Sequence, residues 1–151
     1  MPKKETIERA RQDKREGKAP STQAGEFVRE EIEEIRAGKH GARSAKQAIA
    51  IGLSKARRAG VDLPPPKSGE APAATRRKAA RDYAAGQANP RRKPSAKRSR
   101  ATARALQRES GSAASHAALS RQARRAAGQR TAADRSAAAK KAARTRKRTQ
   151  A

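Results

Sequence analysis

The chain has 151 residues, and its 39 Lys and Arg against 14 Asp and Glu give a net charge of +25 at pH 7. Hydrophobic residues, with alanine counted among them, make up 34% and aromatic residues 1%, which excludes a large hydrophobic core. The absence of Cys excludes disulfides and thiolate metal sites. This composition predicts a small ordered unit followed by a long basic tail.

The charge also predicts the class of partner. A pI near 11.8 makes a polyanion the expected partner, and nucleic acid is the most abundant polyanion in a cell. A membrane surface competes for this role, but no basic stretch also carries the bulky apolar side chains that an interfacial helix inserts. There is no secretory signal and no apolar run of about 20 residues, so we expect a cytoplasmic, nucleoid-associated protein without a membrane partner.

Residues 1–20 are predicted to form a flexible N-terminal arm with a short helix over residues 5–16. Glu5 and Arg9 stand at the i,i+4 spacing that stabilises isolated helices. Ile7 is the only large apolar residue of this helix. Either Ile7 docks the helix on the next one, or the arm stands alone.

A second helix is predicted over residues 22–37, with Ser21 or Thr22 as its N-cap and Gly38 as its stop. Apolar side chains repeat along it at helical spacing, which predicts one packing face. This face consists of Ala24, Phe27, Val28, Ile32 and Ile35.

A third helix is predicted over residues 45–59. Ser44, followed three residues later by Gln47, has the spacing of a capping box, and Gly60 supplies the stop. The apolar residues of this helix share an arc of about 140°, and its cations lie opposite. One side is expected to pack and the other to meet solvent or an anion.

Residues 21–63 are therefore expected to form a helical hairpin module, with Val61 and Leu63 folding back over it. Two helices with one Phe and a few aliphatic residues are too small for a core to give much stability alone. Ile51 lies outside the apolar arc, so we expect it in a homodimer contact.

Glu31 falls inside the apolar arc of the second predicted helix, where an unpaired charge would be costly. Two placements remain open for its side chain. It either reaches water at an edge of the arc or pairs with Lys46 or Lys55.

Residues 64–151 are predicted to be a largely disordered tail rich in Ala, Lys and Arg, which begins at three prolines. The tail holds 24 basic residues and 4 acidic ones. Three segments have helix-forming composition behind a Ser or Thr N-cap: residues 96–109 after Ser95, 113–127 after Ser112 and 132–148 after Thr131. Because no segment carries an apolar stripe, these helices are expected to be transient. The predicted fold class is all-α, a small helical hairpin with a largely disordered tail.

No motif in the sequence indicates catalysis, a cofactor or a metal. There are two His residues, no glycine-rich phosphate loop and no HExxH motif, and this composition cannot wall off a cleft that shifts pKa values. No second metal ligand lies at a usable spacing from His40, so His40 is expected to be a loop residue. We predict that the protein is not an enzyme.

The loop over residues 38–44 is the candidate for a specific anion contact. Glycines beside free amides at a helix N-terminus form an anion site, and Lys39, Arg43 and Lys46 add charge. We therefore predict that this loop grips a DNA backbone phosphate. The alternative is a plain turn between helices with solvated charges.

Most nucleic-acid contacts are expected from the tail, to phosphates and without sequence specificity. Tyr83 is the only aromatic residue of the tail, so base stacking is nearly absent, which favours duplex over single-stranded DNA. The residues expected to bind nucleic acid are Lys39, Arg43, Lys46, Arg57, Arg58, Arg76, Arg77, Lys78, Arg91, Arg92, Lys93, Lys97, Arg98, Arg124, Arg125, Lys140, Lys141, Arg144, Arg146, Lys147 and Arg148.

The run KQAIAIGLSKARRAG, residues 46–60, resembles the core of a family of small basic bacterial proteins of unknown function. The longer stretch over residues 1–66 resembles members often labelled DNA-binding or plasmid-stabilisation proteins. This resemblance implies a bacterial cytosolic setting and assigns no catalytic or binding residue. The tail is separately similar in composition to histone H1-like bacterial proteins.

The sequence as a whole predicts non-specific duplex DNA binding through the polycationic tail, as in a nucleoid-associated or plasmid-maintenance factor. One alternative is a protein-interaction module, in which the hairpin binds a protein and the tail only localises it. A second alternative is an RNA-binding or ribosome-associated protein, since electrostatics alone does not separate RNA from DNA.

Overall fold

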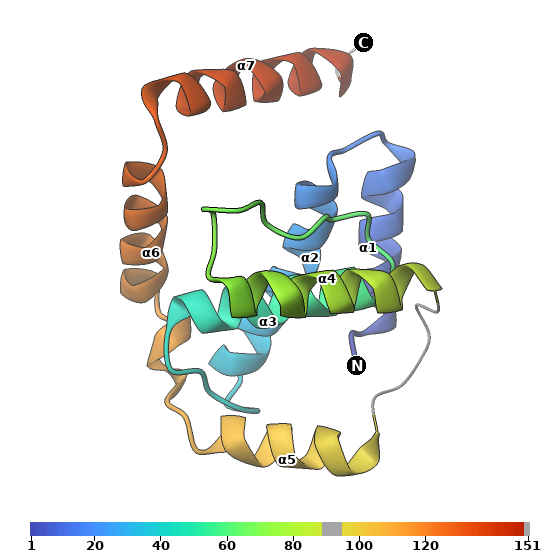
Figure 1. The fold of residues 1–151 in the computed structure, drawn as a ribbon, viewed down its shortest axis with the longest axis vertical. Helices are drawn as coiled ribbons and strands as arrows, with labels where there is room; N and C mark the ends of the chain where they lie inside the picture. Colours follow the sequence, from blue (N-terminus) through green and yellow to red (C-terminus); the bar gives the residue numbers. More distant parts are fainter. Residues whose placement is uncertain (89–94, 150–151) are drawn as a thin grey trace.

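The computed structural model describes residues 1–88 and 95–149. These residues form seven α-helices and one 3-10 turn. In chain order the elements are α1 (Lys4–Arg15), α2 (Pro20–Arg36), α3 (Ala45–Arg58), α4 (Ala73–Ala88), α5 (Ala96–Gln107), η1 (Gly111–Ala114), α6 (His116–Gly128) and α7 (Ala132–Thr149). In Figure 1, helices α1 to α4 cross one another at the centre, and α5, α6 and α7 run along three successive sides around them.

Helices α2 and α3 pack directly against each other and form the centre of the fold. Their backbones approach closely at Gly52, where an added Cβ atom would lie 2.6 Å from the Cα atom of Val28. The N-cap of α3 is as predicted, since the Ser44 hydroxyl accepts a hydrogen bond from the Gln47 amide at 3.2 Å. The predicted cap of α2 is wrong: α2 starts at Pro20, whose fixed φ suits the first turn.

The core consists of two small clusters of buried side chains. One joins Ile32 and Ile35 of α2 to Ala48 of α3, and Ala113 and Ala114 of η1 belong to it. The other is built around Phe27, which is 1% exposed. Alanine supplies most of the buried positions, so the core is made of closely packed backbone rather than of large side chains.

The second cluster also holds the segments that precede and follow the helical hairpin. Val61 is buried against Phe27 and Leu63 packs beside it, so this segment folds back as predicted. Ile7 of α1 packs on the same cluster. Of the two alternatives for the N-terminal helix, the structure therefore has the docked one.

A buried carboxylate holds the start of α1 on α2. Glu30 is 1% exposed, and its two carboxylate oxygens accept the Lys3 amide, each at 3.2 Å. Lys3 is the N-cap residue of α1, and its own side chain does not cap the helix. A negative charge at a helix N-terminus is favourable, so Glu30 both satisfies this amide and orients α1.

The prediction of a small hairpin with a largely disordered tail is wrong, because residues 73–88 and 95–149 form α4 to α7. Two parts of this region enter the centre of the fold. Gly86 of α4 packs against α3, and Ala113 and Ala114 of η1 complete a core cluster. A lack of Leu, Ile and Val stripes argues against packing of the tail, whereas its glycine and alanine residues let the backbone approach the hairpin directly.

The three C-terminal helices attach to this centre through the turn η1, through a loop, and through α6, which contacts α3 and packs Leu119 on the first core cluster. None of the residues of α5 or α6 is buried, and residues 132–148 of α7 are all at least partly exposed. The Arg36 guanidinium donates a hydrogen bond to the Ala114 carbonyl at 2.9 Å, which ties η1 to α2. Helices α5 to α7 therefore add surface to the fold rather than core.

Candidate functional site

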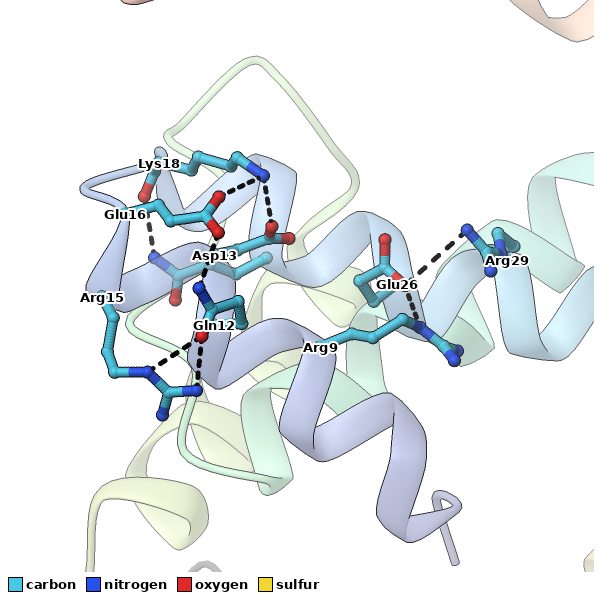
Figure 2. A network of polar contacts seen from close by, with 9 residues as sticks. Arg9, Gln12, Asp13, Arg15, Glu16, Lys18, Glu26 and Arg29 are labelled. Atoms are coloured by element: carbon cyan, nitrogen blue, oxygen red, sulfur yellow. Dashed lines mark hydrogen bonds and ion pairs between the residues drawn. The ribbon is translucent and has the colours of Figure 1, made fainter. Parts of the chain in front are cut away.

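In residues 1–63, about half of the cations, eight of fifteen, pair with carboxylates. Figure 2 shows a network in which Arg9 contacts Glu26 at 2.5 Å and Lys18 lies between two carboxylates. The Lys18 ammonium is 2.8 Å from Asp13 and 2.7 Å from Glu16. Hydrogen bonds to these two groups raise the pKa of Lys18 above its ordinary value. This part of the molecule thus balances much of its own charge.

The cations of the C-terminal helices, in contrast, have few carboxylates near them in the sequence. Residues 95–149 hold sixteen Lys and Arg against two acidic residues, Glu109 and Asp134. Glu109 pairs with Arg43, which belongs to the loop before α3, at 3.9 Å. Among the residues that the structure describes, no Lys or Arg of 95–149 lies within ion-pair distance of a carboxylate. These cations face solvent and form an unbalanced positive surface on α5, α6 and α7.

Helix α7 carries the densest part of this surface. Thr131 and Asp134 cap its start, because the Thr131 hydroxyl accepts from the Asp134 amide at 3.1 Å and donates to the Asp134 carboxylate at 2.7 Å. The hydrogen bonds that the Thr131 hydroxyl and amide donate to the Asp134 carboxylate lower the pKa of Asp134. At about 100° per residue, five exposed cations share an arc of about 120°: Lys140, Lys141, Arg144, Lys147 and Arg148. One face of α7 is therefore a continuous cationic stripe.

Most residues predicted to bind nucleic acid have exposed side chains. These are Lys39, Arg43, Lys46, Arg77, Lys78, Lys97, Arg98, Arg124, Arg125, Lys140, Lys141, Arg144, Arg146, Lys147 and Arg148. Arg58 and Arg76 are half-buried, and Arg58 lies 3.6 Å from Asp82. Arg91, Arg92 and Lys93 lie outside the described residues. Exposed cations that the prediction leaves out include Arg100, Arg104, Arg121 and Arg135.

Arg57 is predicted to contact nucleic acid, but its side chain is buried, at 7% exposure. Its guanidinium donates hydrogen bonds to the Leu63 carbonyl at 3.1 Å and to the Pro64 carbonyl at 3.3 Å. Burial lowers the pKa of Arg57, against the opposing effect of Asp82. Arg57 therefore fixes the chain as it leaves α3, and its side chain is not available to a polyanion.

Backbone contacts already occupy part of the loop before α3. The Gly41 amide donates to the Leu106 carbonyl at 2.9 Å, and the Ala42 amide donates to the Ser110 carbonyl at 3.0 Å. These bonds dock the end of α5 on the hairpin. Two amides that the sequence assigns to a phosphate are thus used internally, and the predicted phosphate contact of this loop rests on its exposed side chains.

A cluster of ionisable groups lies beneath this loop. Glu31 is 0% exposed, and its carboxylate lies 2.6 Å from the Lys55 ammonium. Lys55 also donates to Glu34 at 3.0 Å. The expectation that Glu31 reaches water is wrong, and the alternative pairing with Lys55 is confirmed. Although burial opposes both shifts, the mutual hydrogen bonds lower the pKa of Glu34 and raise that of Lys55.

His40 completes the cluster because the end of α2 turns sharply back. Gly38 adopts a φ of 71°, and the Gly38 and Lys39 amides donate to the Ile35 and Glu34 carbonyls at 3.0 and 3.1 Å, a Schellman motif. The His40 Nε2 atom consequently lies 3.5 Å from Glu31 and 3.9 Å from Glu34.

Three potential ligand atoms therefore meet at one point. One atom each of Glu31, Glu34 and His40 lies within 4.8 Å of the other two, and no other such group occurs among the described residues. The expectation that His40 has no second ligand nearby is wrong, because the turn at Gly38, and not sequence spacing, brings these residues together. The signal in the sequence is the i,i+3 pair of carboxylates followed by a glycine stop and a His.

This cluster forms part of the wall of a cavity of about 530 Å³. The cavity lies between the start of α1, the α2–α3 hairpin and α5, and its apolar wall includes Ile7, Ile51 and Leu106. Ile51 is half-buried and faces this cavity rather than standing free on the surface. Its predicted role in a homodimer contact remains a prediction.

These features define a small helical protein whose residues 1–63 hold fifteen basic and ten acidic residues, and whose residues 95–149 hold sixteen basic and two acidic ones. Residues 3–67 are similar to a family of unknown function (DUF6496). The match agrees with the resemblance to a family of unknown function and carries no DNA-binding or plasmid-stabilisation label. No curated protein and no solved structure matches the chain.

The family match spans α1, α2 and α3 and stops before α4. It therefore includes Glu31, Glu34 and His40 and leaves out the cationic helices. In the described part of the chain, no helix combines the length and apolar character needed to cross a bilayer.

Proposed function

We propose that the protein binds duplex nucleic acid without sequence specificity, through the exposed cations of α5, α6 and α7, and that DNA is its partner. This proposal rests on the difference in ion pairing between the N-terminal and C-terminal cations. Eight of the fifteen Lys and Arg of residues 1–63 lie within ion-pair distance of a carboxylate, whereas none of the sixteen cations of residues 95–149 does within the described part of the chain.

Counterion release supplies the driving force. Each phosphate that a Lys or Arg neutralises frees condensed cations from the nucleic acid, and this term dominates non-specific binding. A helix with a one-sided cationic stripe, as on α7, can lie along the phosphates without entering a groove. Such contacts position the protein and do not read bases.

The aromatic residues favour a duplex over a single strand. Single-strand binders stack bases on exposed aromatic side chains. Here Phe27 is buried in the core, and the Tyr83 hydroxyl donates to the Asp62 carboxylate at 2.6 Å. The chain has one Phe, one Tyr and no Trp, so it offers few aromatic rings on which bases stack.

The setting is that of a nucleoid-associated or plasmid-maintenance protein. In the alternative of a protein-interaction module, the acidic face of α2 and Ile51 would bind a protein partner. Glu30, Glu31 and Glu34 are instead engaged inside the fold, which leaves this alternative with less support. RNA remains a competing ligand, and a direct comparison of the two nucleic acids separates it from DNA.

The deciding experiment compares two variants that lose the same charge. The triple variant K140Q/R144Q/K147Q removes three cations of the α7 stripe, and the control K4Q/K14Q/R29Q removes three cations of α1 and α2. Affinity for duplex DNA, duplex RNA and single-stranded DNA is measured by fluorescence anisotropy at several salt concentrations. We expect the α7 variant to lose far more affinity for duplex DNA than the control. Equal losses, or tighter binding to RNA than to DNA, would contradict the proposal.

A further inference from the structure

We propose that Glu31, Glu34 and His40 form a binding site for one divalent transition-metal ion, with Zn²⁺ as the working probe. This inference is independent of nucleic-acid binding, since all three residues lie within the α2–α3 hairpin. It goes beyond the family match, which assigns no site.

The tautomer of the His40 ring supports this proposal. The His40 Nδ1 atom lies 3.1 Å from the Gly41 carbonyl oxygen, which can only accept a hydrogen bond, so Nδ1 carries a hydrogen. In the neutral ring, Nε2 then presents a lone pair toward Glu31 and Glu34. An Nδ1–H bond to a backbone carbonyl is the usual partner of a metal-binding His, because it fixes the ring and its tautomer.

The buried carboxylate of Glu31 supports the metal site independently of His40. Glu31 is fully buried, and Lys55 lies beside Oε2, at 2.6 Å. The other oxygen, Oε1, has no hydrogen-bond partner among the described residues and lies 3.5 Å from His40 Nε2. A buried carboxylate oxygen without a partner is costly, and a cation between Oε1 and Nε2 removes this cost.

The distances suit such an ion. Metal–ligand bonds of about 2.0–2.2 Å in a tetrahedral site place ligand atoms about 3.4 Å apart. The observed separations from His40 Nε2 are 3.5 Å to Glu31 and 3.9 Å to Glu34. Glu31 and Glu34 stand at i,i+3 on one face of α2, the spacing at which helical side chains meet. The Glu34 oxygen that lies 3.9 Å from His40 Nε2, Oε2, also accepts from Lys55 at 3.0 Å, so Glu34 has to turn toward the ion to complete the set.

The ligand set determines which metal ions suit the site, and the exposure of the ligands determines how an ion reaches it. One imidazole and two carboxylates suit Zn²⁺, Co²⁺ or Mn²⁺, whereas soft ions prefer thiolates, which this chain lacks. Three protein ligands leave a position for water. Glu34 and His40 are slightly exposed toward the cavity, which gives the ion an entry path.

The test uses the full chain, freed of metal with a chelator, at pH 7.5. Zn²⁺ binding is measured by isothermal titration calorimetry, and Co²⁺ is added to read the visible absorption of four- or five-coordinate cobalt. The chain has two His residues, so H40A removes a proposed ligand and H116A, at an exposed position of α6, is the matched control. E34Q weakens a second ligand without emptying the core.

We expect wild type and H116A to bind one Zn²⁺ per chain, to give the cobalt band and to gain thermal stability with metal. H40A and E34Q should each lose at least about tenfold in affinity and lose the cobalt band, with circular dichroism showing that they still fold. If H40A binds as tightly as H116A, or if wild type binds no metal, the proposal is overturned.

Discussion

Gly86 of α4 lies so close to the last turn of α3 that a Cβ atom added at Gly86 would overlap the carbonyl oxygen of Arg57. No side chain can occupy that space without moving one helix. G86A is therefore expected to release α4 from α3, with loss of hydrogen-exchange protection over residues 73–88. G128A serves as the control, because a Cβ there meets nothing within 4 Å.

The control should behave in the opposite direction. Gly128 ends α6 with a negative φ, and glycine in a helix costs about 0.5–1 kcal/mol relative to alanine. G128A should thus leave stability unchanged or raise it slightly. Equal exchange over residues 73–88 in G86A and wild type would show that α4 does not depend on this close approach.

The salt dependence of DNA binding gives a second prediction. If about ten phosphates are neutralised, log Kobs should fall with log salt with a slope of about −9 on duplex DNA. K140Q/R144Q/K147Q should reduce the magnitude of this slope by about 2.7, because each phosphate that is no longer neutralised accounts for about 0.9. A shallow wild-type slope would speak against binding through phosphates.

The loop before α3 allows a narrower test. Arg43 and Lys46 are exposed, whereas Lys39 lies 3.7 Å from Glu34. R43A/K46A should weaken DNA binding modestly if the loop touches a phosphate, with unchanged thermal stability. The same affinity in the variant and wild type would remove this loop from the interface.

The buried pair of Lys55 and Glu31 predicts a large effect on stability. K55M leaves a fully buried carboxylate without its cation, so it should cost about 3 kcal/mol in the free energy of unfolding. The double variant E31Q/K55M removes both charges and should recover much of this loss. Urea denaturation measures both, and additive effects of the two substitutions would show that the pair is not coupled.

The pKa of Glu34 predicts how stability depends on pH. The folded protein holds this pKa below its ordinary value, so the stabilisation is present above about pH 4.3 and is lost as the pH falls through the folded value. Lys55 has a raised pKa, so its contribution is fully present below the ordinary lysine value of about 10.4 and is lost as the pH rises through the folded value. Urea midpoints between pH 3 and 8 should therefore fall on the acid side, and less steeply in E34Q.

Local cap signals in the sequence predict some helix starts and miss others: the predicted caps of α2 and α6 are wrong, because α2 starts at Pro20 and Ser115, not Ser112, caps α6. Ser44 and Thr131 place the starts of α3 and α7 correctly, and these signals act between residues three apart. The sequence does not predict α4, because Gly86 has the character of a helix breaker. Its actual role is a close approach to α3, which only the folded neighbour makes visible.

Some of the candidate site residues can likewise be predicted from the sequence, and others cannot. The exposed cations of α7 follow from composition, because a charged residue without an apolar stripe around it stays at the surface. The burial of Arg57 and the meeting of His40 with Glu31 do not follow, since both depend on how the chain turns after α3 and after α2. The sequence shows that Glu31, Glu34 and His40 are present, but it does not give the distances between their side chains.

The exposed cations of α5, α6 and α7 have a consequence for how this protein tolerates change. Residues that bury nothing can be exchanged at little cost to folding. The number of positive charges on these helices is thus free to vary by mutation while the hairpin stays intact. Binding strength and foldability become separate traits, each adjustable in its own part of the chain.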